Sequence, residues 1–162
     1  MPEKRQQSSM PGRVREHVGD VCGTVVVGVD GSACGRHALR FAADEARARG
    51  CSLVALRAWS LPTAPRPAGV QAGVVPPMTE FERAVAAEVS AEVTDELGEE
   101  PGCPVLVIPV HEHAGPALVE ASRSALVVVV GHRGHSGVAG RILGSVSEHL
   151  VRHGEGPVTI VR

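Results

Sequence analysis

The sequence predicts an α/β fold in which helices cover both faces of an open, Rossmann-like, five-stranded parallel sheet. Two observations support this prediction. Short runs of β-branched residues alternate along the chain with longer segments of helical periodicity, and Gly, Pro and Ser separate the two kinds of segment. The strand-like runs are also continuously apolar, as expected for parallel strands that are buried on both faces.

The first half of the predicted domain holds two strands and a helix. A β-branched run over 24–29 predicts the first strand. Ser32 suits the N-cap of a helix over 33–49, and Gly50 suits its end. A second strand is expected over 52–58.

The second half begins with a Pro- and Gly-rich stretch over 62–77, which we interpret as a long surface loop. Thr79 and Glu82 have the spacing of a capping box, which predicts a helix from there to about Leu97. The remaining expected elements are a strand over 105–110, a helix over 116–124, a strand over 125–130, a glycine-rich connection over 131–143, a helix over 144–153 and a strand over 157–161.

Length and composition favour one domain. With 162 residues, the chain can bury a core without support from disulfides or metals. Residues 1–22 show no periodicity and predict a flexible leader, whereas 23–162 form the expected domain. A formal net charge of -2 gives no general attraction to nucleic acid or to anionic lipid, so we expect neither partner.

The predicted location is cytoplasmic. The longest apolar run, 125–130, is far shorter than the roughly 20 residues that cross a bilayer, and the N-terminus lacks the apolar core of a signal peptide. No two cysteines form a C-x-x-C pair, so reduced structural thiols are expected rather than a disulfide framework or a zinc site. The cysteines are Cys22, Cys34, Cys51 and Cys103.

The scarcity of lysine and of aromatic residues argues against further classes of function. Lys4 is the single lysine and lies in the predicted leader, which argues against a P-loop and against Schiff-base chemistry. The chain has no tyrosine, one tryptophan and two phenylalanines, too few for a platform that stacks single-stranded nucleic acid.

A glycine-rich segment follows the most apolar strand. Its glycines stand at positions 131, 134, 137, 140 and 144. Glycines let a backbone approach an anion closely, and a helix that opens near Gly144 presents unpaired N–H groups, so phosphate is the expected occupant. Ser145 and Ser147 could add hydroxyl donors, and Arg133 or Arg141 a charged fork. On glycine density alone, an ordinary flexible surface loop with a serine cap explains the segment equally well.

The spacing of this segment resembles a known signature. Gly131-x2-Gly134-x9-Gly144-Ser145 matches the ATP-binding motif of the universal stress protein family. The stretches 25–32, 53–59 and 157–161 resemble that family's first, second and closing strands, so the likeness covers about residues 23 to 162. The resemblance implies an adenine nucleotide alpha hydrolase-like fold and ATP as ligand, with or without Mg²⁺.

The resemblance also implies roles for individual residues. Asp30 would contact the ribose or the adenine, while Val29 and Ala58 would line the base. Position supports Asp30 independently, because a carboxylate that ends the first strand of such a sheet lies at the ligand crevice. The predicted binding residues are Val29, Asp30, Ala58, Val130, Gly131, Arg133, Gly134, Gly144, Ser145, Val146 and Ser147. His132, His135 and Gly140 depart from the family's usual pattern.

Histidines suggest two other readings. His132-Arg-Gly-His135 imitates the H-x-G-H motif of nucleotidylyltransferases, but that motif follows the first strand of those enzymes and here it follows the fourth. The pairs His111/His113 and His149/His153 have ligand-like spacing without an assured third ligand, so we expect solvated histidines and no metal site.

The predicted function is a nucleotide-dependent sensor or regulator of the stress response. The glycine-rich segment contains no Asp or Glu before Glu148, so slow hydrolysis is the most that we expect. The alternative is a non-nucleotide-binding interaction protein of the same fold that acts as a dimer. The resemblance implies a homodimer through antiparallel pairing of the last strand, Val158–Val161, whereas a covered or bulged edge would leave a monomer. The sequence leaves the preferred adenine nucleotide open.

Overall fold

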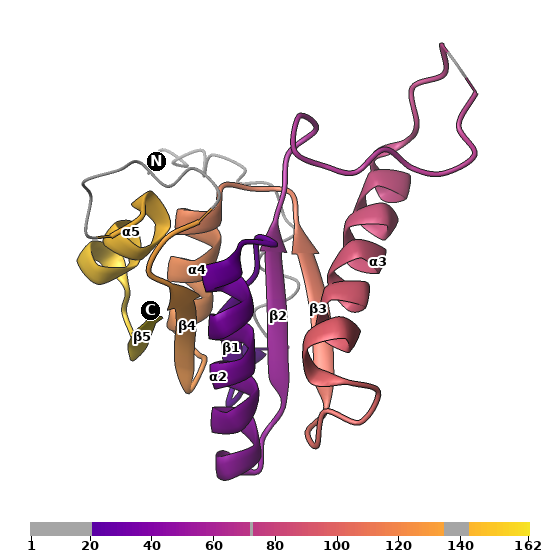
Figure 1. Ribbon diagram of the computed structural model, residues 1–162. Helices are drawn as coiled ribbons and strands as arrows, with labels where there is room; N and C mark the ends of the chain where they lie inside the picture. The colour runs from indigo at the N-terminus through magenta and orange to yellow at the C-terminus, as the bar shows by residue number, and fades with distance from the viewer. Residues whose placement is uncertain (1–20, 72, 135–142) are drawn as a thin grey trace, which may run out of the picture.

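The computed structural model describes residues 21–71, 73–134 and 143–162. Strands and helices alternate along these residues (Figure 1). The elements are β1 (Val25–Gly28), α2 (Ala33–Arg49), β2 (Leu53–Ala58), α3 (Met78–Leu97), β3 (Val105–Val110), α4 (Ala114–Ser122), β4 (Val127–Gly131), α5 (Ser145–His153) and β5 (Val158–Val161).

The strands form one parallel sheet in the order β3-β2-β1-β4-β5. Starting from β1 at the centre, the chain adds β2 and β3 on one side and then returns to add β4 and β5 on the other. The strand order therefore reverses between β1 and β4, and ligands of open α/β sheets bind beyond the strand ends at such a point. The predicted fold class is confirmed.

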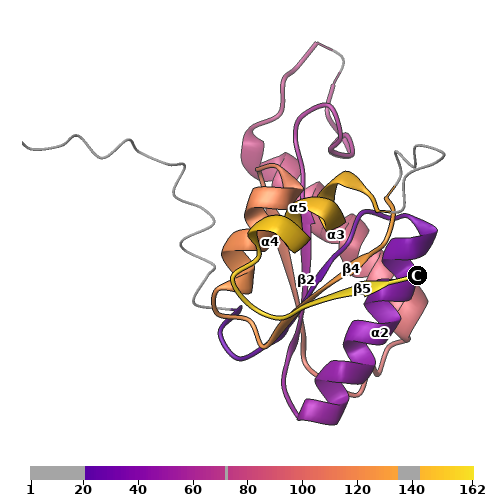
Figure 2. The ribbon, with the colours of Figure 1, turned by 90° about the vertical axis from the view of Figure 1, so that its left-hand side faces the viewer.

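Helices cover both faces of the sheet, as Figure 2 shows edge-on. Alternate residues of a strand point to opposite faces. Val25 and Val27 accordingly pack in one core with α2 and α3, whereas Val26 packs in a second core with α4 and α5. The central strands are buried on both sides, which explains their uninterrupted apolar sequence.

The caps of α2 are those that the sequence predicts. The Ser32 hydroxyl accepts a hydrogen bond from the Gly35 backbone N–H, and Gly50 adopts the left-handed conformation with φ of 62°. A glycine is favoured there because side chains with a Cβ rarely adopt this conformation. The sharp turn at Gly50 sends the chain directly into β2.

Two helix starts differ from the prediction. α3 begins at Met78 after Pro77 and has no side-chain cap, so the capping box expected at Thr79 and Glu82 is wrong. α4 begins at Ala114 and not at Pro116. Proline is tolerated throughout the first helical turn, where backbone N–H groups lack helical partners, and so Pro116 did not mark the first residue.

Smaller differences concern the strands and the domain start. β4 runs over Val127–Gly131, shifted toward the C-terminus from the expected 125–130. Val21 was assigned to the leader, yet its side chain is only 3% exposed and packs in the core beneath α4. The packed domain thus includes Val21, and residues 1–20 of the predicted leader over 1–22 lie outside the described residues.

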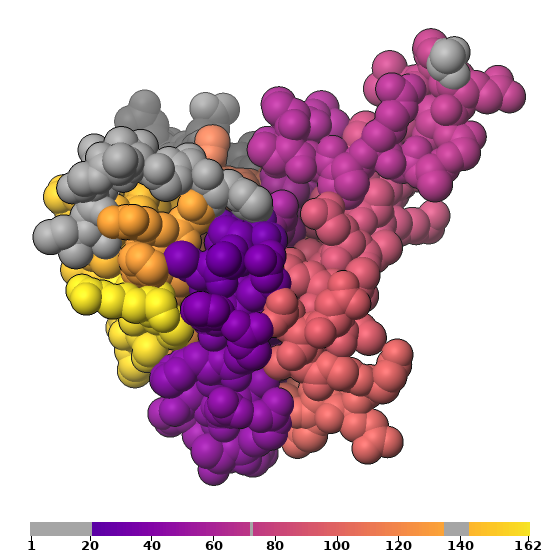
Figure 3. Space-filling model, in the orientation of Figure 1, coloured from indigo at the N-terminus to yellow at the C-terminus, as the bar shows by residue number. Residues whose placement is uncertain are grey.

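The segment between β2 and α3 projects from the body of the molecule (Figures 1 and 3). It includes the exposed Val74 and Val75. This agrees with the surface loop expected over 62–77. In the described ranges, no helix is both long enough and apolar enough to span a membrane.

Candidate functional site

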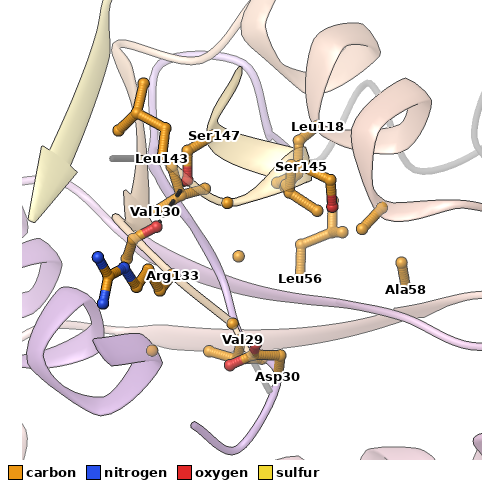
Figure 4. Close-up of a pocket in the computed structure, with 17 residues that line it drawn as sticks. Val29, Asp30, Leu56, Ala58, Leu118, Val130, Arg133, Leu143, Ser145 and Ser147 are labelled. Carbon is orange, nitrogen blue, oxygen red and sulfur yellow. Dashed lines mark hydrogen bonds between the residues drawn. The ribbon is translucent and has the colours of Figure 1, made fainter. Parts of the chain in front are cut away.

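A pocket lies at the carboxyl ends of β1, β2 and β4, where the strand order reverses. The starts of α2, α4 and α5 close its sides. The pocket encloses about 170 Å³ of space that water-sized molecules can reach, and it opens to solvent. Its centre is open and ringed by apolar and polar side chains (Figure 4).

The structure brings all the predicted binding residues to this one pocket. They are Val29, Asp30, Ala58, Val130, Gly131, Arg133, Gly134, Gly144, Ser145, Val146 and Ser147. Residues separated by more than 100 positions in sequence thus line one cavity. That they bind a nucleotide stays a prediction.

Six further lining residues were not predicted: Gly28, Gly35, Leu56, Ala114, Leu118 and Leu143. Leu56 is predictable in retrospect, because it lies two residues before Ala58 in the same strand and shares its face. Leu118 depends on how α4 crosses the sheet, which no local pattern indicates. Leu56 and Leu118 both extend the apolar wall of the pocket on its α4 side, and such a wall suits a flat aromatic ligand.

Asp30 is held by the turn that follows β1. Its Oδ1 accepts hydrogen bonds from the Ser32 backbone N–H at 3.0 Å and from the Ser32 hydroxyl at 2.6 Å. Its other oxygen, Oδ2, faces Gly134, where an added Cβ would lie only 2.6 Å away. One carboxylate oxygen therefore orients the side chain, while the other lies between β1 and the glycine-rich segment.

A backbone hydrogen bond of 2.7 Å, from the Gly144 N–H to the His132 carbonyl, joins the two ends of the glycine-rich segment. A Cβ on Gly144 would lie 3.3 Å from Arg133 Cα. At Gly131, a Cβ would lie 2.7 Å from the backbone carbon of Cys34, in the first turn of α2. Glycine is required there because β4 and α2 approach too closely for a side chain. His135, Gly137, Gly140 and Arg141 lie outside the described residues.

The first turn of α5 faces the pocket. Gly144 is its N-cap, and the first intrahelical bond runs from the Glu148 N–H to the Gly144 carbonyl. The N–H groups of Ser145, Val146 and Ser147 consequently have no helical acceptor. Together with the helix dipole, these groups form a site suited to an anion.

The two serines of this turn differ in their surroundings. Ser145 is exposed, and its hydroxyl has no hydrogen-bond partner within the described residues. Ser147 is 2% exposed, and its hydroxyl donates to the Gly131 carbonyl at 2.7 Å. This geometry differs from the expectation that Ser147 donates its hydroxyl proton to a phosphate, because that proton is already used to attach α5 to β4.

The polar and apolar sides of the pocket are separated in space. Figure 4 shows Arg133 at one end and Ala58 at the other, with Asp30 below the open centre. Arg133 is exposed and carries a permanent charge. The end near Arg133 and the α5 start suits an anionic group, and the end near Ala58 and Leu56 suits an apolar ring.

A group of partly buried charged side chains lies behind the pocket. Arg57 donates to the Val29 carbonyl at 3.3 Å, and Glu92 of α3 lies near it. Burial raises the pKa of the Glu92 carboxyl, and the nearby Asp30 charge raises it further, although Arg57 and Arg36 partly oppose both effects. This group links the pocket to α3.

Four of the histidines contact other protein groups. His132 donates its backbone N–H to the Val161 carbonyl at 2.7 Å, and so joins the start of the glycine-rich segment to β5. The His111 ring lies 4.6 Å from that of Trp59, and the rings of His149 and His153 are also 4.6 Å apart. Within 21–71, 73–134 and 143–162, no group of three His, Cys, Asp or Glu residues could hold a metal ion.

Fold and site together define a doubly wound α/β protein with one ligand pocket described at its switch point. The family model of the universal stress protein family matches residues 23–162, nearly the whole chain. The chain belongs to the universal stress protein family.

Curated relatives include mycobacterial proteins. Universal stress protein Rv2623 of Mycobacterium tuberculosis is 36% identical over 140 residues, a match that covers 85% of this chain and 44% of that protein. Universal stress protein Rv2005c of the same species is 34% identical over 142 residues and is covered to 45%. This chain therefore spans about half the length of the curated relatives that it matches.

Solved structures of the family share the fold. A universal stress protein in complex with cAMP superposes with a TM-score of 0.60 at 28% identity, covering 88% of this chain and 98% of that one. A universal stress protein from Archaeoglobus fulgidus superposes with a TM-score of 0.57 at 22% identity, covering 86% and 98%.

Proposed function

We propose that this protein binds an adenine nucleotide, with ATP as the first candidate, in the pocket between β1 and β4. The observation that carries the proposal is the convergence in one cavity of the free N–H groups of α5, the Asp30 carboxylate and an apolar wall. The structural relative with bound cAMP supports an adenine nucleotide as the ligand class.

The two ends of the pocket suggest the orientation of the ligand. The N–H groups of Ser145, Val146 and Ser147, with Arg133, would hold the phosphates. Val29, Leu56 and Ala58 would pack against the base. Asp30, through the oxygen that faces Gly134, would accept a hydrogen bond from a ribose hydroxyl or from the adenine amine.

Hydrolysis is expected to be slow or absent. Asp30 is the single carboxylate that lines the pocket in the described part of the chain, and one of its oxygens is occupied by Ser32. Efficient phosphoryl transfer needs a group that orients water as well as ligands for Mg²⁺. Any Mg²⁺ bound to the phosphates would have Asp30 as its one carboxylate ligand among the described lining residues. We therefore propose a regulator whose conformation depends on nucleotide, in the stress response for which the family is named.

We further propose that the protein forms a homodimer through β5. We also propose that it is cytoplasmic and responds to the cellular ATP pool. β5 lies at one edge of the sheet and pairs only with β4 among the described strands. Each residue of β5 is half-buried. An exposed apolar edge strand is a ready template for pairing with a second copy.

Calorimetric titration tests the nucleotide proposal. The full chain, stripped of nucleotide, is titrated with ATP, ADP, AMP and cyclic AMP. The fluorescence of Trp59, the single tryptophan, gives a second readout, because Trp59 is the neighbour of Ala58 in the chain. Saturable heat is expected for at least one nucleotide. Asp30→Asn keeps an oxygen for the Ser32 turn but removes the charge, and it should weaken affinity about tenfold, or about 1.4 kcal/mol.

Asp95→Asn is the matched control, since it makes the same change of charge at an exposed position on α3. If both variants give the same binding heat as the parent protein, the nucleotide binds outside this pocket. No heat with any nucleotide, combined with a dimeric mass, would favour the non-nucleotide interaction protein instead.

A further inference from the structure

The two crossovers on the β2–β3 side of the sheet end in the same short pattern. α2 leads into Gly50-Cys51-Ser52-Leu53, and α3 leads into Gly102-Cys103-Pro104-Val105. Both glycines adopt positive φ, 62° and 75°, and turn the chain toward its strand. Each crossover thereby places one cysteine two residues before its strand begins.

Strand register brings the two cysteines side by side. β2 and β3 pair in parallel with Leu53 opposite Val105, and the Leu53 N–H donates to the Pro104 carbonyl at 2.9 Å. The ladder begins at this pair, and Cys51 and Cys103 each lie two residues before it, so the same register, if extended, would place them opposite one another. Neighbouring strands lie about 4.8 Å apart, which falls within the Cα separation of about 4.4–6.8 Å that a disulfide requires.

The side chains of the pair also share a face. Residues two apart in a strand point the same way, and Leu53 and Val105 both pack against the core beneath α2 and α3. Cys51 and Cys103 pack against the same core. Each cysteine is half-buried, so neither residue is fully enclosed in the core.

Arg47 provides a nearby positive charge. Its Nε donates to the Pro101 carbonyl at 2.6 Å, and its side chain covers Gly102. Burial raises the pKa of the Cys103 thiol, and the Arg47 guanidinium partly opposes this. The charge of a Cys51 thiolate also raises the pKa of Cys103.

We propose that Cys51 and Cys103 form a redox site, a dithiol that a peroxide converts into a disulfide joining the starts of β2 and β3. The site is independent of nucleotide binding. It lies at the amino ends of the strands, at the opposite end of the sheet from the pocket (Figure 1).

The reaction balances with hydrogen peroxide as the oxidant. The Cys51 thiolate attacks one peroxide oxygen, the O–O bond breaks, and the departing hydroxide takes a proton to become water, which leaves a sulfenic acid on Cys51. The Cys103 sulfur then attacks the Cys51 sulfur, so that the S–S bond forms and the S–O bond breaks. The second hydroxide takes the Cys103 proton. Two thiols and one peroxide give one disulfide and two waters. Cys51 is assigned the first attack because burial disfavours the Cys103 thiolate.

Peptide mapping of the full chain tests the proposal. The reduced protein is treated with hydrogen peroxide, blocked with an alkylating agent, digested without reductant and analysed by mass spectrometry. A peptide pair joined through Cys51 and Cys103 is expected, and dithiothreitol should separate it. The oxidised form should melt about 5–10 °C higher than the reduced form, because the bridge closes a long loop.

Cysteine variants sharpen the result. Cys22→Ser/Cys34→Ser should keep the link, whereas Cys51→Ser or Cys103→Ser should abolish it and leave a sulfenic or alkylated partner. Calorimetry with nucleotide should give the same affinity for oxidised and reduced protein. A link through Cys22 or Cys34, links only between chains, or free Cys51 and Cys103 after peroxide has oxidised Cys22 would overturn the proposal.

Discussion

The Ser147 hydroxyl donates a hydrogen bond of 2.7 Å to the carbonyl oxygen of Gly131, and this bond attaches the first turn of α5 to the end of β4. The two residues flank the glycine-rich segment. Ser147 is buried and the bond is partly buried, and the bond helps to set the position of the N–H groups that face the pocket. Ser147, the buried serine of this turn, is therefore expected to contribute more to stability than Ser145.

Ser147→Ala should lower the free energy of unfolding by about 1 kcal/mol, because it removes a partly buried hydrogen bond and leaves the Gly131 carbonyl without this donor. Chemical denaturation followed by circular dichroism measures the change. A variant as stable as the parent protein would show that the bond does not hold α5 in place.

Ser145→Ala should behave in the opposite way. Ser145 is exposed, so its replacement should change stability by less than about 0.5 kcal/mol. Its hydroxyl faces the pocket, and the loss of one phosphate contact should weaken nucleotide binding several-fold in calorimetry. Unaltered affinity would remove Ser145 from the proposed phosphate site.

Gly131→Ala should be more damaging than Gly144→Ala. A Cβ at Gly131 would lie 2.7 Å from backbone carbon and 2.8 Å from backbone oxygen of Cys34, and helix backbone cannot rotate away as a side chain can. We expect a loss of about 2 kcal/mol. At Gly144 the nearest atom is 3.3 Å away, and the loss should stay below about 1 kcal/mol. Thermal denaturation of both variants compares them, and equal losses would contradict the close approach of β4 to α2.

The sequence predicted those features that depend on neighbours along the chain. The Ser32 cap, the Gly50 turn and the apolar strands each follow from a few adjacent residues. The pocket residues were predictable because parallel strands bring their carboxyl ends together, so Asp30 and Gly131 had to meet. Leu118 and the bond from Ser147 to Gly131 were not predictable, since they depend on how α4 and α5 pack on the sheet.

The Glu92 carboxyl should make stability depend on pH. Burial raises its pKa in the folded protein above its usual range, with Asp30 and Glu88 adding to the effect and Arg57 and Arg36 opposing it. The folded state thus favours the protonated form. This contribution to stability is fully present below the ordinary pKa of glutamate, about 4.3, and is lost as the pH rises through the raised value.

Glu92→Gln mimics the protonated carboxyl at every pH. The variant should be more stable than the parent protein at neutral pH, and the difference should shrink as the pH falls toward the ordinary glutamate value. Urea denaturation at a series of pH values measures it, with the exposed Glu99→Gln as the control that should show little effect. A difference that stays constant with pH would show that Glu92 is not the titrating group.

The β5 edge offers a sharp test of the proposed dimer, because backbone groups along a strand point alternately to its two sides. The Pro157 carbonyl accepts from Val128 in β4, and the Val161 carbonyl accepts from His132, the residue after β4. By alternation, the N–H and carbonyl of Ile160 point outward, where a second copy would pair with them. Proline is tolerated at such an outward position, since its missing N–H leaves the bonds to β4 intact.

Ile160→Pro should therefore convert the dimer to a monomer, whereas Ile160→Ala should leave it a dimer. Both variants lose the side chain that packs against the core, so they share that cost in stability, and only proline removes the outward N–H. Light scattering coupled to size-exclusion chromatography gives the mass of each, and circular dichroism confirms that both fold. A folded Ile160→Pro variant with the mass of a dimer would place the interface elsewhere, and a parent protein that is already monomeric would leave β5 as an unpaired edge.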